Sequence, residues 1–202
     1  MGGPDSRSGV VEPGGELPEE LARAVRLVVL DVDGVLTDGG VYVGELPGGE
    51  ALEMKRFDIQ DGLGIKLLQD AGIEVAVVSG RMSRATEIRA RELGIEECHQ
   101  DGGALKVPLV RRLMEKRGLE WDQVAMLGDD LPDLAVLRRV GLPAVVANAT
   151  EEAREAAIWM GRRKGGQGAV REFCEVLLKA RGEWDEQVDS YVTARSGPVD
   201  GG

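Results

Sequence analysis

Residues 27–39 read LVVLDVDGVLTDG, and this stretch decides the fold class of the chain. Its first four residues are apolar with two β-branched valines at the centre, which is typical of a strand buried on both faces of a parallel sheet. The run ends in Asp31 and Asp33, and Asp38 follows closely. Three carboxylates beyond a buried strand are costly unless a cation compensates their charge. Because open α/β sheets bind ligands beyond the carboxyl ends of their strands, we expect a functional site here; the alternative is an Asp–Gly turn with solvated acids.

Downstream of this stretch, short apolar runs alternate with segments of helical periodicity. We expect further strands at residues 74–78, 97–99, 124–127 and 144–146, and helices at 18–26, 62–71, 83–93, 104–117, 131–140, 150–157 and 169–180. This alternation predicts right-handed βαβ units and therefore an α/β fold with one doubly wound, Rossmann-like parallel sheet. Residues 40–57 break the alternation and predict a small β-hairpin insert. No segment resembles a large cap domain.

A single domain accounts for the 202 residues, because the apolar fraction of 43% is enough for one core of ordinary size. We place this domain at residues 18–182. Residues 1–17 are rich in Gly, Pro and acidic residues and are predicted to form a disordered lead. Residues 183–202 are predicted to form a flexible polar tail.

The chain is strongly acidic, with 25 Lys and Arg against 36 Asp and Glu and a formal net charge of -11. This balance argues against binding to nucleic acid or to an anionic membrane surface, and an anionic substrate would need a local cation such as a metal ion. Cys98 and Cys174 form no CxxC pair, so we expect reduced thiols and a cytoplasmic protein. No apolar run approaches the roughly 20 residues that span a membrane, and we expect no targeting segment.

Polar side chains follow three of the predicted strands, and another lies near the start of a predicted helix. These residues are Asp31, Asp33, Ser79, Lys106, Asp129 and Asp130. In a doubly wound sheet they lie at the same edge, where helices also begin and their free N–H groups favour anions. Several carboxylates close together require a cation, and Mg²⁺ prefers one or two carboxylates, water and a substrate phosphate. The only histidine is His99, so a zinc site is disfavoured.

This set of residue types predicts phosphoryl transfer. Asp31 would attack phosphorus while Mg²⁺ screens the repulsion between its carboxylate and the phosphate. Asp33 would protonate the leaving alkoxide and later activate water. Ser79 and Lys106 would hold the phosphoryl oxygens as their charge changes.

Four motifs carry a resemblance to a known superfamily. DVDGVLTD at 31–38, SGR at 79–81, Lys106 and GDDLPD at 128–133 resemble the motifs of the haloacid dehalogenase superfamily of aspartyl phosphatases. With the hairpin, FDIQDGLGIK at 57–66 and GGQGAVREFCEVLL at 165–178, residues 26–184 resemble the 3-deoxy-D-manno-octulosonate 8-phosphate phosphatases. The resemblance implies a Mg²⁺-dependent homotetramer that acts on a sugar-acid phosphate in lipopolysaccharide biosynthesis.

The resemblance also implies residue roles. Asp31 would be the nucleophile and a metal ligand, Asp33 the acid and base that gives its backbone carbonyl to the metal, Asp129 a further ligand and Asp130 a supporting carboxylate. Substrate contacts are implied at Asp58, Ile59, Gln60, Asp61, Gly62, Lys66, Arg81 and Arg89, together with Lys106. Residue 60 departs from the pattern, since some members place Arg there. The family also uses the loop at 165–168 and Arg171 near a site.

Structural roles remain open for several of these residues. Asp61 and Gly62 can form a turn and helix cap, whereas Lys66 and Arg89 can lie on the solvated faces of their helices. Asp133 can support the Asp129 loop or bond to a helix N-terminus.

Two further functions compete with the phosphatase of the eight-carbon substrate. The first is a phosphatase of a nine-carbon ulosonate 9-phosphate, or one with broad sugar substrates. The second is a weakly active oligomerisation domain, like the one appended to sialate cytidylyltransferases; the presence of all four motif residues, Asp31, Asp33, Lys106 and Asp129, disfavours it. A mutase is disfavoured because no large cap would shield a phosphoenzyme from water.

Overall fold

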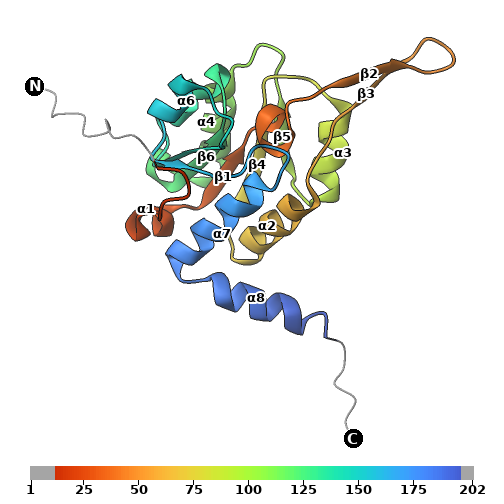
Figure 1. The fold of residues 1–202 in the computed structure, drawn as a ribbon. Helices are drawn as coiled ribbons and strands as arrows, with labels where there is room; N and C mark the ends of the chain where they lie inside the picture. The colour runs from red at the N-terminus through yellow and green to blue at the C-terminus, as the bar shows by residue number, and fades with distance from the viewer. Residues whose placement is uncertain (1–11, 197–202) are drawn as a thin grey trace, which may run out of the picture.

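Six parallel strands form the central sheet of the computed structural model, which describes residues 12–196 (Figure 1). Their order across the sheet is β5-β4-β1-β6-β7-β8. The strands are β1 (Leu27–Leu30), β4 (Glu74–Ser79), β5 (Glu97–Gln100), β6 (Val124–Gly128), β7 (Leu142–Val145) and β8 (Trp159–Met160). Strand order reverses at β1, which confirms the predicted doubly wound α/β fold.

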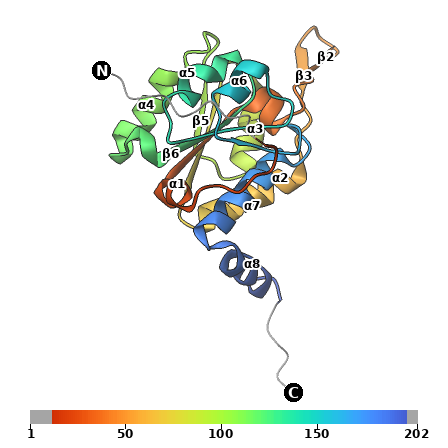
Figure 2. The ribbon, with the colours of Figure 1, turned by 60° about the vertical axis from the view of Figure 1, so that its left-hand side comes forward.

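Helices cover both faces of this sheet (Figures 1 and 2). One face carries α1 (Glu19–Ala24), α2 (Ile59–Asp70) and α7 (Ala169–Arg181), and the other carries α4 (Lys106–Arg117), α5 (Leu134–Leu137) and α6 (Glu151–Glu155). The remaining helix of the domain, α3 (Arg84–Glu92), follows β4 and begins at Ser83, whose side chain accepts a hydrogen bond from the Thr86 N–H. Short turns of 3-10 helix, η2 (Trp121–Gln123) and η3 (Leu131–Asp133), flank β6.

Strand β1 lies at the centre of the molecule. Its alternate residues contribute to different cores: Val28 and Leu30 pack beneath α2 and α7, whereas Leu27 and Val29 pack beneath α4 and α5. All four side chains are fully buried, as the apolar run predicted. Two hydrophobic layers therefore fix the strand that leads into the acidic stretch.

The register of the sheet brings three strand ends together. Leu30 pairs with Val77 on β4 and with Leu127 on β6, so the residues that follow β1, β4 and β6 share one edge. The chain leaves β1 through a wide helical turn, η1 (Val32–Leu36), in which Asp33 and Gly34 have non-helical backbone dihedral angles. Gly34 has a φ of 97°, a conformation that residues with a side chain rarely adopt.

The predicted insert forms an antiparallel hairpin of β2 (Tyr42–Glu45) and β3 (Ala51–Met54). It projects away from the sheet and helices (Figures 1 and 2). Apolar side chains on it are exposed, including Val43 at 78%, Tyr42 at 57% and Met54 at 54%.

Both ends of the described chain differ from the expectation of a disordered lead and a flexible tail. Pro13 bridges to Met160 on β8, and the Trp159 indole donates a hydrogen bond to the Gly15 carbonyl, so the lead is held against the sheet from residue 13. At the other end, helix α8 (Trp184–Thr193) packs on α7 and α2. The predictions for residues 1–11 and 197–202 lie outside the described residues.

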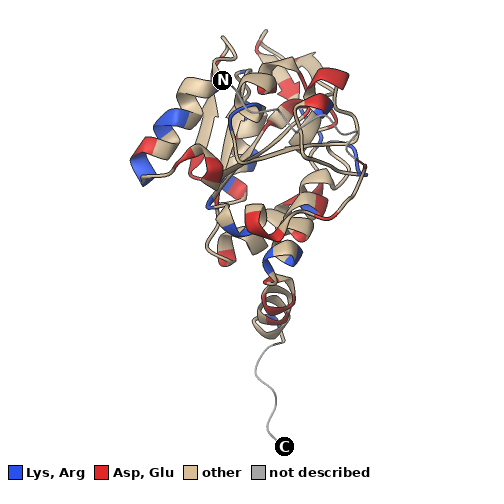
Figure 3. Ribbon diagram, turned by 90° about the vertical axis from the view of Figure 1, so that its left-hand side faces the viewer, with Lys and Arg blue, Asp and Glu red and all other residues tan. Residues whose placement is uncertain are grey.

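Charge is spread over the molecule. Figure 3 shows Asp and Glu interspersed with Lys and Arg on the helices of the side that it presents. Within residues 12–196, none of the helices combines the length and the apolar character that crossing a membrane requires.

Candidate active site

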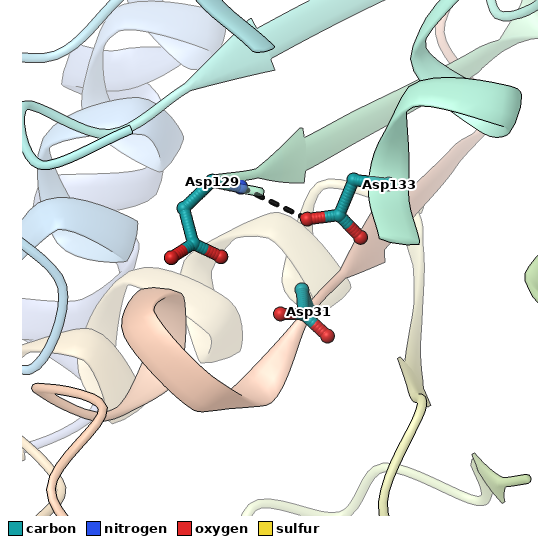
Figure 4. A group of neighbouring side chains, drawn as sticks. All are labelled: Asp31, Asp129 and Asp133. Carbon is teal, nitrogen blue, oxygen red and sulfur yellow. Dashed lines mark hydrogen bonds between the residues drawn. The ribbon is translucent and has the colours of Figure 1, made fainter. Parts of the chain in front are cut away.

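Three carboxylates meet beyond the ends of β1 and β6 (Figure 4). Asp31 directly follows β1, Asp129 directly follows β6, and Asp133 ends the turn η3. One oxygen of each lies within 4.8 Å of the other two. The parallel register of β1 and β6 produces this cluster, because it aligns Leu30 with Leu127 and so places the following residues side by side.

Lys106 supplies the positive charge of the cluster. Its Nζ donates to Asp31 Oδ1 at 2.5 Å and to Asp133 Oδ1 at 2.6 Å, and its side chain is only 3% exposed. Burial acts to lower the pKa of Lys106, but the two carboxylates more than offset burial and raise this pKa above its usual value. The first residue of α4 is therefore a buried ammonium rather than a surface lysine.

Asp133 supports the loop that carries Asp129. Its Oδ2 accepts the N–H of Asp129 at 2.9 Å, the contact drawn in Figure 4, and the N–H of Asp130 at 3.4 Å. Its Oδ1 is taken by Lys106. Asp133 is 1% exposed and thus holds both the Asp129 loop and Lys106 in place. Asp130, by contrast, is exposed and accepts a hydrogen bond from the Leu131 N–H.

The electrostatics of the cluster favour a bound cation. Burial, followed by the charges of Asp31 and Asp133, raises the pKa of Asp129 to about 8. Burial and the charge of Asp133 also raise the pKa of Asp31 to about 6, although Lys106 opposes this. Asp129 Oδ1 is buried and has no hydrogen-bond partner within residues 12–196. An oxygen without a partner, in a set of carboxylates that is short of positive charge, fits Mg²⁺.

A cavity of about 230 Å³ opens onto these groups. The predicted catalytic and metal residues that line it are Asp31, Asp33, Ser79, Lys106, Asp129 and Asp130, and Arg81 and Asp133 line it as well. Ser79 ends β4 and is 1% exposed, and its Oγ accepts from the Arg81 N–H and donates to the Arg81 carbonyl, both at 3.2 Å. A larger cavity of about 690 Å³ between α3 and β5 is lined by none of the predicted catalytic residues.

Asp33 has a partner that sequence reasoning missed. Lys55, just after β3, donates from Nζ to Asp33 Oδ1 at 2.7 Å, and the Lys55 side chain is fully buried. Asp33 itself is 28% exposed at its side chain and faces the cavity. A lysine at the end of an exposed hairpin carries no sequence signal for this role.

A second group that the sequence did not indicate holds the turn η1 in place. The Asn148 side chain donates to the Gly34 carbonyl at 3.0 Å and accepts the Gly165 N–H at 2.7 Å. A Cβ on Gly165 would lie 1.8 Å from the Gly34 oxygen, and one on Gly34 would lie 2.0 Å from Asp129 Oδ2. Glycine is therefore required at both positions by close approach.

The predicted substrate contacts on α2 lie apart from the acidic cavity. Asp58 caps the helix through the Gln60 N–H, and the Gln60 side chain accepts from Arg163. Asp61 is 1% exposed, and its Oδ1 accepts the Arg171 N–H at 2.8 Å. This bond ties the first turn of α2 to that of α7.

The other predicted contacts have structural surroundings too. Arg89 donates to the Asp58 carbonyl and lies over the Phe57 ring, and Gly62 is packed close to Arg89. Lys66 pairs with Asp70 on an exposed face of α2, and Ile59 is 78% exposed. Among the predicted substrate contacts, only Arg81 and Lys106 line the cavity.

Comparisons with known proteins agree with this geometry. Residues 100–171 match the model of the haloacid dehalogenase-like hydrolase family. The chain is 42% identical over 165 residues to 3-deoxy-D-manno-octulosonate 8-phosphate phosphatase KdsC of Escherichia coli (strain K12), covering 82% of this chain and 85% of that protein.

Solved structures lead to the same family. A probable yrbi family phosphatase from Pseudomonas syringae superposes with a TM-score of 0.78 at 44% identity, covering 86% of this chain and 96% of that one. The 3-deoxy-D-manno-octulosonate 8-phosphate phosphatase from Moraxella catarrhalis, solved in complex with magnesium, phosphate and KDO, superposes with a TM-score of 0.79 at 38% identity, covering 86% and 97%. The chain therefore belongs to the 3-deoxy-D-manno-octulosonate 8-phosphate phosphatase family of the haloacid dehalogenase-like hydrolases.

Proposed function

We propose that the chain is a Mg²⁺-dependent phosphatase that releases phosphate from 3-deoxy-D-manno-octulosonate 8-phosphate through an aspartyl-phosphate on Asp31. The observation that carries this proposal is the meeting of Asp31, Asp129 and Lys106 in one cavity at the strand ends. The names of the relatives at 42% and 38% identity support the choice of substrate.

Mg²⁺ would be held by the carboxylates of Asp31 and Asp129 and by the backbone carbonyl of Asp33, with Asp130 in support. Asp133 is less available, because Lys106 and two backbone N–H groups already occupy its oxygens. When bound, the ion supplies positive charge that screens the repulsion between Asp31 and an incoming phosphate.

The residues of the chain perform the steps. An Asp31 oxygen bonds to phosphorus while the ester P–O bond breaks, and Asp33 gives its proton to the leaving alkoxide. Ser79 and Lys106 hold the phosphoryl oxygens during transfer, since both line the cavity beside Asp31. Asp33 then takes a proton from water as the water oxygen bonds to phosphorus and the Asp31–phosphorus bond breaks.

We also propose that the chain assembles as a homotetramer through its hairpin. A two-stranded hairpin is marginally stable by itself, and this one exposes Val43, Tyr42 and Met54. Exposed apolar surface of this kind is typical of an interface. Two further proposals concern the setting of the enzyme: the cysteine usage supports a cytoplasmic location, and the resemblance supports a place in lipopolysaccharide biosynthesis.

A phosphate-release screen tests the substrate and the metal together. Purified protein is assayed with ulosonate 8- and 9-phosphates and with common hexose phosphates, each with Mg²⁺ and with excess EDTA. We expect the highest kcat/KM on the eight-carbon 8-phosphate, no turnover in EDTA and recovery on adding Mg²⁺. Preference for a 9-phosphate, or equal rates on hexose phosphates, would contradict the proposed eight-carbon substrate. Full activity in EDTA would contradict the proposed dependence on Mg²⁺.

A further inference from the structure

Lys55 is a buried lysine on a segment that is otherwise exposed. Its side chain is 0% exposed although its backbone is partly accessible, and it follows directly after the hairpin strand β3. Within residues 12–196, the one hydrogen-bond partner of its Nζ is Asp33 Oδ1, at 2.7 Å. The two residues are 22 positions apart in the sequence.

Burial of this ammonium has an energetic cost that surface lysines avoid. A lysine at a hairpin base normally extends its flexible stem into water, where the charge is solvated. Here the stem is enclosed, so the contact with a carboxylate must compensate the lost hydration. An enclosed side chain with one partner also has little freedom, and it therefore fixes the carboxylate that it holds.

The neighbours of Lys55 at the base of the hairpin contact other loops of the molecule. Glu53 accepts from Arg81 Nη2 at 2.7 Å and from Ser83 Oγ at 2.6 Å, and Arg56 donates to the Gly166 carbonyl at 2.7 Å. With the bond of Lys55 to Asp33, residues 53–56 thus contact three loops, and two of these loops contribute lining residues to the cavity. Among these contacts, the bond from Lys55 is the one that reaches Asp33, the residue proposed to transfer the proton.

We propose that Lys55 is the positioning residue for Asp33, an inference that rests on the proposed function. By holding Oδ1, Lys55 leaves Oδ2 of Asp33 free to exchange a proton in the cavity that Asp33 lines. In the first half-reaction the Asp31–phosphorus bond forms, the ester P–O bond breaks, and the leaving oxygen takes the proton of Asp33. In the second, water gives a proton back to Asp33 as it displaces Asp31 from phosphorus.

This role differs from a purely structural ion pair in its dependence on the leaving group. A sugar alkoxide needs a proton as it departs, whereas p-nitrophenolate is stable without one. The ratio kcat/KM covers only the steps up to formation of the phosphoenzyme. Loss of proton delivery therefore lowers kcat/KM for a sugar phosphate much more than for p-nitrophenyl phosphate, whereas a folding or binding defect lowers both alike.

The test uses Lys55→Met, which keeps the volume of the buried stem and removes the charge. We expect kcat/KM on 3-deoxy-D-manno-octulosonate 8-phosphate to fall about tenfold or more. On p-nitrophenyl phosphate we expect kcat/KM to fall less than about threefold. Lys116→Met is the matched control, because Lys116 donates to Glu97 at 2.8 Å on the surface and its loss should leave both values unchanged. Equal losses on both substrates, or no loss on either, would overturn the proposal.

Asp33→Asn separates this inference from the proposed function. Asp33→Asn should show the same dependence on the leaving group, and adding Lys55→Met to it should cost less than about twofold more if Lys55 acts through Asp33. A variant Asp33→Asn that lacks this dependence contradicts the role of Asp33 itself. If Asp33→Asn shows the expected dependence on the leaving group but Lys55→Met loses activity equally on both substrates, only the positioning role of Lys55 is contradicted. Thermal unfolding measures whether each variant is folded. If Lys55→Met does not fold, Lys55→Gln takes its place in the same comparison.

Discussion

Asp31 combines burial, an acidic neighbourhood and a lysine partner at the end of the central strand. Its side chain is 9% exposed and bonded to Lys106, which fixes its position in the lining of the cavity. A fixed carboxylate next to a cation is well placed to attack phosphorus, because the reacting atoms are oriented before the substrate binds.

Asp31→Asn is the direct test of this role. We expect phosphate release to fall by at least about a hundredfold, because an amide oxygen is a poor nucleophile. The fold should persist, since Lys106 keeps its bond to Asp133. Turnover is measured by phosphate release, and folding by circular dichroism. Retention of even a tenth of the wild-type rate would contradict the nucleophile role.

Asp61 leads to a prediction on pH. Burial, opposed by the bond from the Arg171 N–H, raises the pKa of Asp61 to about 6 from 3.8, and the nearby charges are those of Asp58 and Arg89. The folded state thus binds the Asp61 proton more tightly than the unfolded state does. The resulting stability is fully present below pH 4 and is lost as pH rises through about 6, by an amount of about 3 kcal/mol.

Asp61→Asn removes this titration while keeping an oxygen for the Arg171 N–H. We expect urea unfolding at pH 5 and pH 7.5, with Mg²⁺ present throughout, to show a smaller loss of stability in the variant than in the wild type. The comparison between the two proteins cancels the contribution of the other carboxylates. Parallel curves for the two proteins would show that Asp61 has an ordinary pKa.

Sequence reasoning at this scale succeeded where a residue follows a predicted strand. Asp31, Ser79 and Asp129 are brought together because the strands are parallel and neighbouring, and a strand end can be located from an apolar run. Lys55 was missed because its burial depends on a contact across 22 residues. Support of the Asp129 loop was one of two structural roles open for Asp133, beside a bond to a helix N-terminus. Its bond to Lys106 depends on how α4 docks, and local sequence does not encode that.

At the scale of elements, the loop before α7 and the turn η1 are packed backbone against backbone. Gly165→Ala should force them apart, because the new Cβ would lie 1.8 Å from the Gly34 oxygen and 2.7 Å from the Thr37 oxygen. We expect an unfolding free energy lower by about 1–3 kcal/mol and a kcat lower by about tenfold or more. Gly102→Ala is the control, since nothing lies within 4 Å of its new Cβ. Equal kcat values in the two variants would contradict a role of this contact in holding η1.

The elements that the sequence missed are short or stabilised from outside. Strand β8 has two residues and pairs with β7 at the edge of the sheet, so its pattern is too short to recognise. Helix α8 is polar and would be marginal in isolation, but Trp184 lies beneath the cations of Arg171 and Lys179. Its stability comes from α7, which no local propensity reveals.

At the scale of the whole molecule, the hairpin is the surface that predicts assembly. Val43→Asp should leave the single chain as stable as before, because the side chain is 78% exposed there. In a tetramer the same carboxylate would be buried without a partner, so we expect the species of about four times the chain mass to be lost. Light scattering after size exclusion measures this. A wild-type protein that runs as a single chain would contradict assembly.

The contacts of Glu53, Lys55 and Arg56 have a practical consequence for protein engineering. Anyone who wishes to obtain a small, single-chain catalyst would be tempted to excise residues 40–57 and join the flanking ends. That shortcut would also remove the groups that hold Asp33 and Arg81, so an inactive product would say nothing about quaternary structure. Redesign should be confined to the distal half of the hairpin, and its base should be kept as part of the enzyme.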